Sequence, residues 1–204
     1  SVYGFGSIGY KNYLFLEFTA RNDWASVLPT QNNSFFYPSV SLSGIISDMA
    51  DLGSNIDYLK VRGSWSEVGS QGALSPYNTN LTYNLSNSGF GNSASTPNTR
   101  YNSDIEPENT TATEFGLDLR MFKSKFKLSL TYYNQEGESL ILPIGTDPAS
   151  GYTAAWKNAA KMSNTGVELS LGATVIRNDN FSLDVDVNWA KNNNEVVDLG
   201  GLDS

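Results

Sequence analysis

The feature that most constrains the fold of this chain is a period-two alternation of apolar and polar residues in six segments. Successive side chains of a β-strand point to opposite sides, so each segment reads as a strand with one apolar and one polar face. The apolar positions are Leu14, Leu16, Phe18, Ala20 and Trp24; Leu59, Val61 and Trp65; Phe115, Leu117, Leu119 and Met121; Phe126, Leu128, Leu130 and Tyr132; Val167, Leu169, Leu171 and Ala173; and Phe181, Leu183, Val185, Val187 and Trp189. With two weaker segments, Tyr3 to Tyr10 and Phe36 to Ser47, we predict about eight antiparallel strands.

The connections between these segments alternate between short and long. Short turns fall at residues 11–12, 123–125 and 176–180, a medium one at 48–57, and long polar stretches at 25–34, 69–109 and 139–160. A soluble domain seldom carries a structureless loop as long as the second of these stretches. Short turns at one end of a sheet and long loops at the other are typical of an outer-membrane β-barrel, whose long loops face outside.

Alternation alone also fits a soluble β-sandwich, which stays open as the alternative architecture. Two observations favour a barrel. Charged residues such as Glu168 and Asp186 stand in mid-strand, as expected for a wet barrel interior. Aromatic rings on the apolar face mark both strand ends, as membrane interfaces favour: Tyr13, Tyr58, Phe126 and Phe181 at one end, Trp24, Trp65, Tyr132 and Trp189 at the other. We therefore predict an all-β fold, an antiparallel transmembrane β-barrel.

The composition argues against an enzyme. The chain has no cysteine and no histidine, which removes thiol chemistry, the commonest general base and the commonest metal ligand. We predict no catalytic residues, no cofactor and no metal site. The net charge of -8 disfavours nucleic acid as a partner. No apolar run is long enough for a transmembrane helix, and the residues after Ser1 lack the pattern of a signal peptide.

Two short motifs match functional patterns in spelling only. Gly4, Gly6 and Gly9 have the spacing of a dinucleotide-binding loop, but a strand-like segment follows them in place of the helix that the motif needs. The segment from Asp184 to Asn188 begins like a calcium-binding loop, but Trp189 occupies the position where a glycine must turn the chain. We interpret both motifs as strand segments.

The long polar stretches carry aromatic residues that are candidates for ligand contact. They are Tyr77, Tyr83, Phe90, Tyr101, Tyr152 and Trp156. Rings in such loops can stack on sugars or pack on a partner, or else they anchor the loop itself. We predict contact with a substrate or a lid for four of them, and we keep loop anchoring as the alternative: Tyr77, Tyr101, Tyr152 and Trp156.

Several strings of the sequence resemble the SusC/RagA family of TonB-linked (TonB-dependent) outer-membrane transporters of Bacteroidetes. They follow the family's order: RNDWASVLP (21–29), FFYPSVSLSGIISD (35–48), YLKVRGSW (58–65), VGSQ (68–71) with PY (76–77), NSDIEPENTTATEFGLDLRMFKSKFKLSLTYYN (102–134), LPIGTDPASGY (142–152), NTGVELSLGA (164–173) and NFSLDVDVNWAKNNNEVVDL (180–199). The resemblance covers nearly the whole chain. Two departures are residues 102–106, where the family usually has Asn-Pro-Asp-Leu-Lys, and Gly44-Ile45, where it usually has a bulky aromatic residue.

The resemblance implies a barrel of about 22 strands around an N-terminal plug. It also implies energy from the TonB complex, a SusD-like surface lipoprotein as a lid, and uptake of a glycan or peptide substrate across the bacterial outer membrane. The chain shows no TonB box, plug or signal peptide, so we expect residues 1–204 to be part of the β-barrel domain. On this interpretation the chain is a multi-pass wall segment with three external loops, in contact with outer-membrane lipid.

Two alternatives to an importer wall stay open. They are a soluble or surface-attached β-sandwich that binds carbohydrate and a complete eight-stranded barrel. A barrel wall requires four apolar side chains to point away from any packed core: Leu16, Leu117, Leu130 and Val185. A sandwich would bury them between two sheets, and a complete small barrel would pair its first strand with its last.

Overall fold

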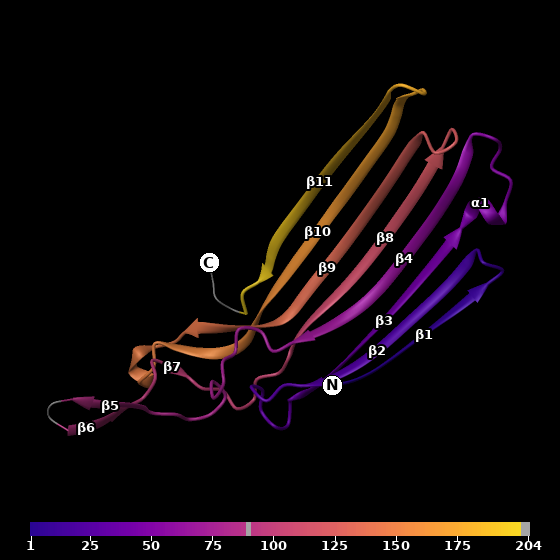
Figure 1. The fold of residues 1–204 in the computed structure, drawn as a ribbon. Coiled ribbons are helices and arrows are strands. Elements are labelled where there is room, and N and C mark those ends of the chain that lie inside the picture. The colour runs from indigo at the N-terminus through magenta and orange to yellow at the C-terminus, as the bar shows by residue number, and fades with distance from the viewer. Residues whose placement is uncertain (89–90, 201–204) are drawn as a thin grey trace.

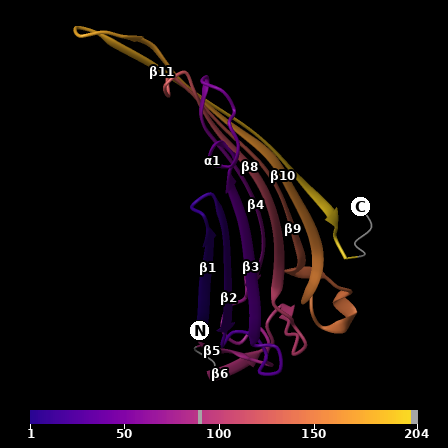
Figure 2. The same cartoon turned by 90° about the vertical axis from the view of Figure 1, so that its right-hand side faces the viewer.

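The computed structural model describes residues 1–88 and 91–200, and its main feature is one curved antiparallel sheet (Figure 1, Figure 2). Eight long strands lie in the order β1-β2-β3-β4-β8-β9-β10-β11. Their bounds are β1 Val2–Tyr10, β2 Leu14–Trp24, β3 Ser34–Ile45, β4 Ile56–Ser70, β8 Glu108–Met121, β9 Phe126–Gly145, β10 Ala154–Arg177 and β11 Ser182–Asp198. The prediction of about eight antiparallel strands is confirmed.

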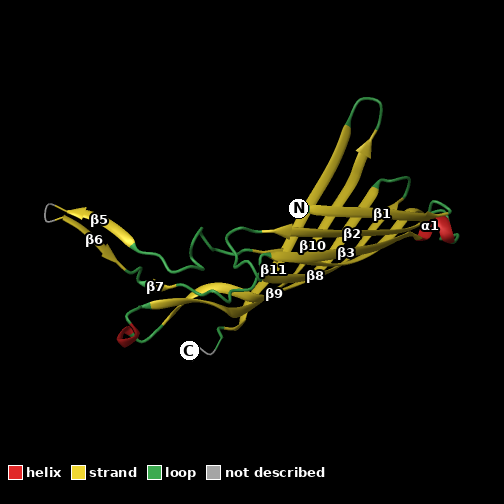
Figure 3. Ribbon diagram, turned by 90° about the horizontal axis from the view of Figure 1, so that it is seen from below, coloured by secondary structure: helices red, strands yellow, loops and turns green. Residues whose placement is uncertain are grey.

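Smaller elements occupy the connections. Between β4 and β8 lie a separate hairpin of β5 (Asn84–Ser88) and β6 (Gly91–Ser95) and a short strand β7 (Thr99–Arg100) that pairs in parallel with β10. A one-turn helix α1 (Ile46–Met49) follows β3, and a 3-10 turn η1 (Pro148–Ser150) joins β9 to β10. The β5–β6 hairpin stands clear of the main sheet (Figure 3). In the part of the chain that the structure describes, no helix has the length and apolar character to cross a membrane.

The strand register places the apolar positions of the strands on one side of the sheet, which we call the apolar face. One row across the sheet is Ile8, Leu16, Leu42, Gly63, Phe115, Tyr132 and Val167. The next row is Gly44, Val61, Leu117, Leu130, Leu169 and Trp189. Many of these side chains are exposed, for example Phe115 at 58%. A water-soluble monomer seldom exposes so continuous an apolar surface, whereas lipid is a suitable neighbour for it.

The structure decides between the architectures that the sequence left open. Leu130 and Val185 are exposed, Leu16 and Leu117 are half-buried, and no second sheet packs on them within the described residues. The sandwich is therefore wrong. The strands β1 and β11 lie at opposite ends of the sheet order and do not pair in the described chain, so the complete eight-stranded barrel is wrong as well.

The two ends of the sheet differ as the pattern of short and long connections predicts. Lys11 and Asn12 turn β1 into β2 with φ values of 49° and 59°, and Lys123 and Ser124 turn β8 into β9 with φ of 59° at both. Positive φ at both central residues matches the right-handed twist of the flanking strands. The tight turns lie at one end of the sheet, and the long connections gather at the other (Figure 1).

The prediction of a loop over residues 139–160 is wrong in most of its length. Strand β9 continues to Gly145 and β10 begins at Ala154, with pairs such as Trp156 to Pro143 extending the ladder. Register shifts at residues 158–160 and 160–162 mark where the β9–β10 hairpin departs from regular pairing. The stretch 69–109 is also more ordered than predicted, since β4 runs to Ser70 and three short strands follow.

The placement of Tyr58 on the apolar face is wrong as well. Its register partner is Arg120, on the polar face, and the Arg120 guanidinium lies 5.1 Å from the Tyr58 ring centre. Regular alternation with Leu59 and Val61 puts Tyr58 on the polar face. A β-bulge at Asp57 returns Ile56, on the other side of the bulge, to the apolar face opposite Met121. The Asp57 carboxylate accepts a hydrogen bond from the backbone N–H of Ser124 at 2.8 Å, which ties the bulge to the neighbouring turn.

Glycine on the polar face makes room for a large ring at one cross-strand pair. Gly166 on β10 faces Tyr133 on β9, and a methyl group on Gly166 would overlap the ring. We expect Gly166→Ala to lower the unfolding free energy of the full-length barrel by about 1 kcal/mol, because the far end of the half-buried Tyr133 ring has to move. The loss of the heat-stable folded band in a temperature series measures this effect. Gly145→Ala, which meets no atom within 4 Å, is the matched control and is expected to leave the series unchanged.

Candidate functional site

The long connections pack on a small hydrophobic cluster of their own, which we call the loop core. It consists of Leu28 between β2 and β3, Leu74 and Ile105 between β4 and β8, and Ile141 near the end of β9. Ile105 is 0% exposed and Ile141 is 1% exposed. Phe35 and Trp156 pack against the cluster from its edge. Segments distant in sequence are therefore held together at this end of the sheet.

The side chain of Asn158 on β10 forms hydrogen bonds with the segment that contains Ile105, and we call this set of bonds the clasp. Its side-chain amide donates to the carbonyl oxygens of Glu106 at 2.8 Å and Ser139 at 2.9 Å, and its Oδ1 accepts from the Glu106 N–H at 2.9 Å. Glu108 adds a further tie, since its carboxylate accepts from the Ile141 N–H at 2.8 Å. The loop is thereby anchored through backbone groups and not only by apolar contact.

Removing this clasp is expected to loosen the loop. Asn158→Ala deletes three hydrogen bonds, each of net worth about 0.5–1.5 kcal/mol, so local opening of residues 102–108 becomes easier by roughly 2–4 kcal/mol. Hydrogen exchange of the Glu106 amide in the full-length protein measures this change. Asn158→Asp keeps an acceptor for the Glu106 N–H but puts a carboxylate oxygen against the carbonyl oxygens of Glu106 and Ser139, so it is expected to loosen the loop at least as much as Asn158→Ala. An unchanged exchange rate in Asn158→Ala would contradict the clasp.

Backbone pairing between β7 and β10 fixes a second part of this region. The register is Ala154 to Thr99 and Ala155 to Arg100, and the Thr153 N–H donates to the Asn98 carbonyl oxygen at 2.9 Å. The Asn102 amide donates to the carbonyl oxygen of Trp156 at 3.0 Å. This pairing brings the chain around Tyr101 beside the start of β10, although the two segments are about fifty residues apart in sequence.

These segments surround an open cavity of about 270 Å³, which we call the loop hollow. Its lining residues are Tyr77, Asn78, Asn80, Leu81, Thr82, Asn84, Pro97, Asn98, Thr99, Tyr101, Tyr152 and Trp156. The four aromatic residues singled out from the sequence thus come together around one cavity. Of the other two loop aromatics, Tyr83 does not line the hollow, and Phe90 lies outside the described residues. Contact of the four rings with a ligand stays a prediction.

Tyr77 stands in an unusual backbone conformation at the hollow. Its φ is 72°, in the left-handed region that costs an ordinary L-residue about 1–2 kcal/mol. The turn is fixed by the Ser75 N–H, which donates to Asn78 Oδ1 at 2.6 Å, and by the Asn80 N–H, which donates to the Tyr77 carbonyl at 3.0 Å. The side chain is nevertheless 69% exposed, so packing does not explain why a tyrosine stands here. Strain at an exposed ring is a feature of functional positions.

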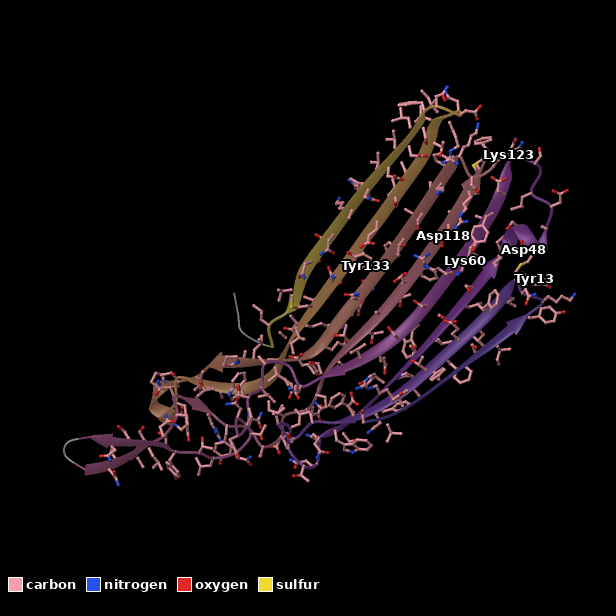
Figure 4. All side chains as sticks on the ribbon, viewed as in Figure 1. Tyr13, Asp48, Lys60, Asp118, Lys123 and Tyr133 are labelled. Atoms are coloured by element: carbon pink, nitrogen blue, oxygen red, sulfur yellow. The ribbon has the colours of Figure 1, made fainter. Side chains whose placement is uncertain are left out.

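The opposite side of the sheet, the polar face, carries a hydrogen-bonded network in mid-strand. Arg62 on β4 donates to Asp118 on β8 at 2.8 Å and to Thr131 on β9 at 2.7 Å, and Ser129 donates to Asp118 at 2.7 Å. Figure 4 marks Asp118 in mid-sheet beside Lys60, its register partner on β4. The network joins three strands across their polar side chains, which suits a wall that faces water or polar protein groups.

The side chains that line the loop hollow are suited to the recognition of a ligand. Its lining contains aromatic rings, amides and the hydroxyl groups of Thr82 and Thr99, and no carboxylate, lysine or arginine. Among residues 1–88 and 91–200, no group of three or more acidic side chains is arranged to hold a metal ion. The hollow can therefore stack on a ligand and exchange hydrogen bonds with it.

Comparison with known proteins settles the family. The β-barrel model of TonB dependent receptor-like proteins matches residues 1–203. The chain belongs to the TonB-dependent receptor family. Among curated relatives, TonB-dependent receptor P26 of Formosa agariphila is 28% identical over the whole chain, and TonB-dependent receptor SusC of Bacteroides thetaiotaomicron is 28% identical over 98% of it. The chain spans about a fifth of the length of these relatives, 21% in each case.

Two solved structures share the fold. The RagAB peptide importer in its closed-closed state superposes with a TM-score of 0.89 at 24% identity, covering 98% of this chain and 22% of that one. The siderophore receptor PirA from Pseudomonas aeruginosa gives 0.59 at 18% identity, covering 95% of this chain and 34% of that one. The recognition of a SusC/RagA-type barrel from the sequence strings is confirmed.

Sequence reasoning missed several residues that build the site. The clasp residue Asn158 and the buried Ile105 were hidden because both lie in polar stretches with no periodic pattern. The amides of Asn80, Asn84 and Asn98 line the hollow, yet many other asparagines occur in the same loops. The available signal was a resemblance: Ile105 and Glu108 stand in the string that is similar to the family's Asn-Pro-Asp-Leu-Lys-Pro-Glu region.

Proposed function

We propose that this chain is a wall segment of an outer-membrane nutrient importer of the SusC/RagA type. In this role the eight strands satisfy their backbone polar groups by pairing across the bilayer. The apolar face contacts lipid, the polar face lines the interior, and the long connections form part of the external surface. Residues 1–204 are then one part of a β-barrel domain that other parts of the protein complete.

One observation carries this proposal: eight antiparallel strands share a single continuous apolar face, with tight turns at one end and long ordered loops at the other. Lipid on one side and a polar lumen on the other explain why apolar and polar residues alternate so regularly along the strands of a sheet that packs on no second sheet. Family membership supports import as the activity. Relatives are named as receptors and a structural neighbour as a peptide importer, and none of these names describes an enzyme.

The proposed partners follow from the same family. A SusD-like surface lipoprotein would cover the external loops, and the TonB complex would supply energy through parts of the protein outside these residues. The proposed substrate is a glycan or a peptide. Four rings of the loop hollow are proposed to contact the substrate, the lid or both: Tyr77, Tyr101, Tyr152 and Trp156.

Fractionation and uptake by cells that express the full-length protein test this proposal. The protein is expected in the detergent-extracted outer membrane, and uptake of a labelled substrate is expected to stop when a protonophore collapses the energy source of TonB. Recovery of the protein in the soluble fraction, or uptake that is insensitive to the protonophore, would contradict it.

A further inference from the structure

We propose that the loop hollow binds an uncharged oligosaccharide, in preference to a charged peptide or an acidic polysaccharide. The inference rests on the proposed function, because it assigns a ligand class to an external cavity of the importer. Within that function it chooses between substrate classes that the family resemblance leaves open.

The first argument is the charge of the lining. None of the twelve lining residues is acidic or basic, although the whole chain carries 21 acidic and 13 basic residues. A site that holds the charged ends or side chains of a peptide needs opposite charges among its own lining residues, since burying an unpaired charge is costly. A site for neutral hydroxyl groups needs none.

The second argument is the kind of polar group present. The side-chain amides of Asn80, Asn84 and Asn98 make no hydrogen bond to any other described residue, so both their donor and acceptor atoms are available. A sugar hydroxyl both donates and accepts, and an amide side chain can satisfy it in either sense. A sugar ring has a face of C–H groups and a rim of hydroxyls. Aromatic side chains can pack on the C–H face, and unpaired amides beside them can form hydrogen bonds with the hydroxyls.

The third argument is the presentation of the rings. Tyr77 projects from a strained turn with 69% of its surface exposed, and Trp156 lies on β10, where the loop core supports one side of it. Rigid aromatic side chains lose little conformational freedom on binding, so they are efficient contacts for flexible chains. The cavity volume of about 270 Å³ is close to the lower limit of ligand pockets, so the hollow takes a short stretch of a longer chain.

A neighbouring hollow makes the preference testable. It shares Tyr101 and Trp156 with the loop hollow but is also lined by Arg100, Asp104 and Lys157. A charged ligand that stacks on the shared rings would depend on these three residues. A neutral ligand in the loop hollow would depend on Tyr77 and not on Lys157.

The test measures binding by calorimetry to the full-length protein, purified from the outer membrane in detergent. The probes are a panel of neutral hexasaccharides of different linkage, hexagalacturonate, and an octapeptide of mixed charge. At least one neutral hexasaccharide is expected to bind, more tightly than hexagalacturonate and the octapeptide. Tyr77→Asn is expected to weaken that binding roughly tenfold or more, because it removes the ring while asparagine still accepts a positive φ.

Matched variants distinguish loss of the Tyr77 ring from general damage to the loop. Tyr83→Asn removes another exposed tyrosine of the same loop, outside the hollow, and Lys157→Ala removes the neighbouring charge; both are expected to bind as the parent does. Trp156→Ala is expected to weaken binding too, but it also touches the loop core, so Tyr77→Asn is the deciding variant. Failure of every neutral probe to bind, tighter binding of a charged probe, or loss of binding in Lys157→Ala alone overturns the inference. These results would leave the protein in the outer membrane. A result that contradicts the proposed function would instead place the protein in the soluble fraction or show uptake without TonB energy.

Discussion

Leu130→Arg in the full-length protein is expected to prevent assembly of the barrel in the outer membrane. Leu130 lies on the apolar face, where its cross-strand neighbours are Leu117 and Leu169. An arginine on the lipid side of a transmembrane strand costs about 2–4 kcal/mol at the middle of the bilayer. That cost is a large fraction of the stability of a typical domain. The amount of folded, heat-modifiable protein in the outer-membrane fraction measures the effect.

The control for this prediction lies one residue away. Ser129→Arg introduces the same charge into the same strand but on the polar face, beside the Asp118 carboxylate that the Ser129 hydroxyl contacts at 2.7 Å. Assembly is expected to stay close to that of the parent. Equal loss of folded protein in both variants would mean that the two faces do not differ in their surroundings, and the assignment of the apolar face to lipid would be wrong.

Ile105→Ala is expected to release the external loops while the barrel stays in the membrane. Ile105 is completely buried against Leu28, Leu74 and Ile141, and truncating a buried isoleucine costs about 2–5 kcal/mol. Three of the four loop-core residues lie in connections, and Ile141 lies near the loop end of β9, so the loss falls mainly on local opening of the loops and not on the whole fold. Limited proteolysis within residues 71–107 is therefore expected to accelerate, with the folded band of the barrel preserved.

A variant in the same connection gives the reference for that experiment. Leu85, on β5, is 85% exposed, so Leu85→Ala removes the side chain of an apolar residue without opening a cavity. Its proteolysis rate is expected to match that of the parent. If Ile105→Ala is as resistant as Leu85→Ala, the loops are held by something other than the loop core.

Much of the sheet could be predicted from the sequence because strand geometry leaves a local mark. Each transmembrane strand has one apolar and one polar face, so period-two alternation identifies segments such as β2, β8 and β11 without knowledge of their neighbours. The loop-side ends of β9 (SLILPIG, 139–145) and β10 (AAWKNAA, 154–160) leave no such mark, because apolar and polar residues do not alternate in them. Asn158 looks like a loop residue, yet it pairs with Ile141, because the two strands continue to pair beyond the regular apolar face.

The candidate site could be predicted only in part. Aromatic residues in long loops were the correct kind of residue to select, but their assembly around one hollow depends on non-local contacts. The parallel pairing of β7 with β10 and the hydrogen bond from Asn102 to Trp156 join segments that no sequence pattern links. The prediction for Tyr58 was wrong for a different reason: it followed the aromatic ring and not the alternation, which puts Tyr58 on the side opposite its neighbour Leu59.

The assignment of the apolar face to lipid is tested most directly by spin labels along β9. The chain has no cysteine, so single cysteines can be introduced at positions 126–133 of the full-length protein, after any cysteine elsewhere is removed. The barrel is then reconstituted in vesicles, and collisions of each label with oxygen and with a water-soluble nickel chelate are measured. Labels at even positions are expected to collide mainly with oxygen, which concentrates in lipid, and labels at odd positions are expected to collide far less with it. Loss of this period-two difference, or even positions shielded from both reagents as in a packed core, would contradict the account.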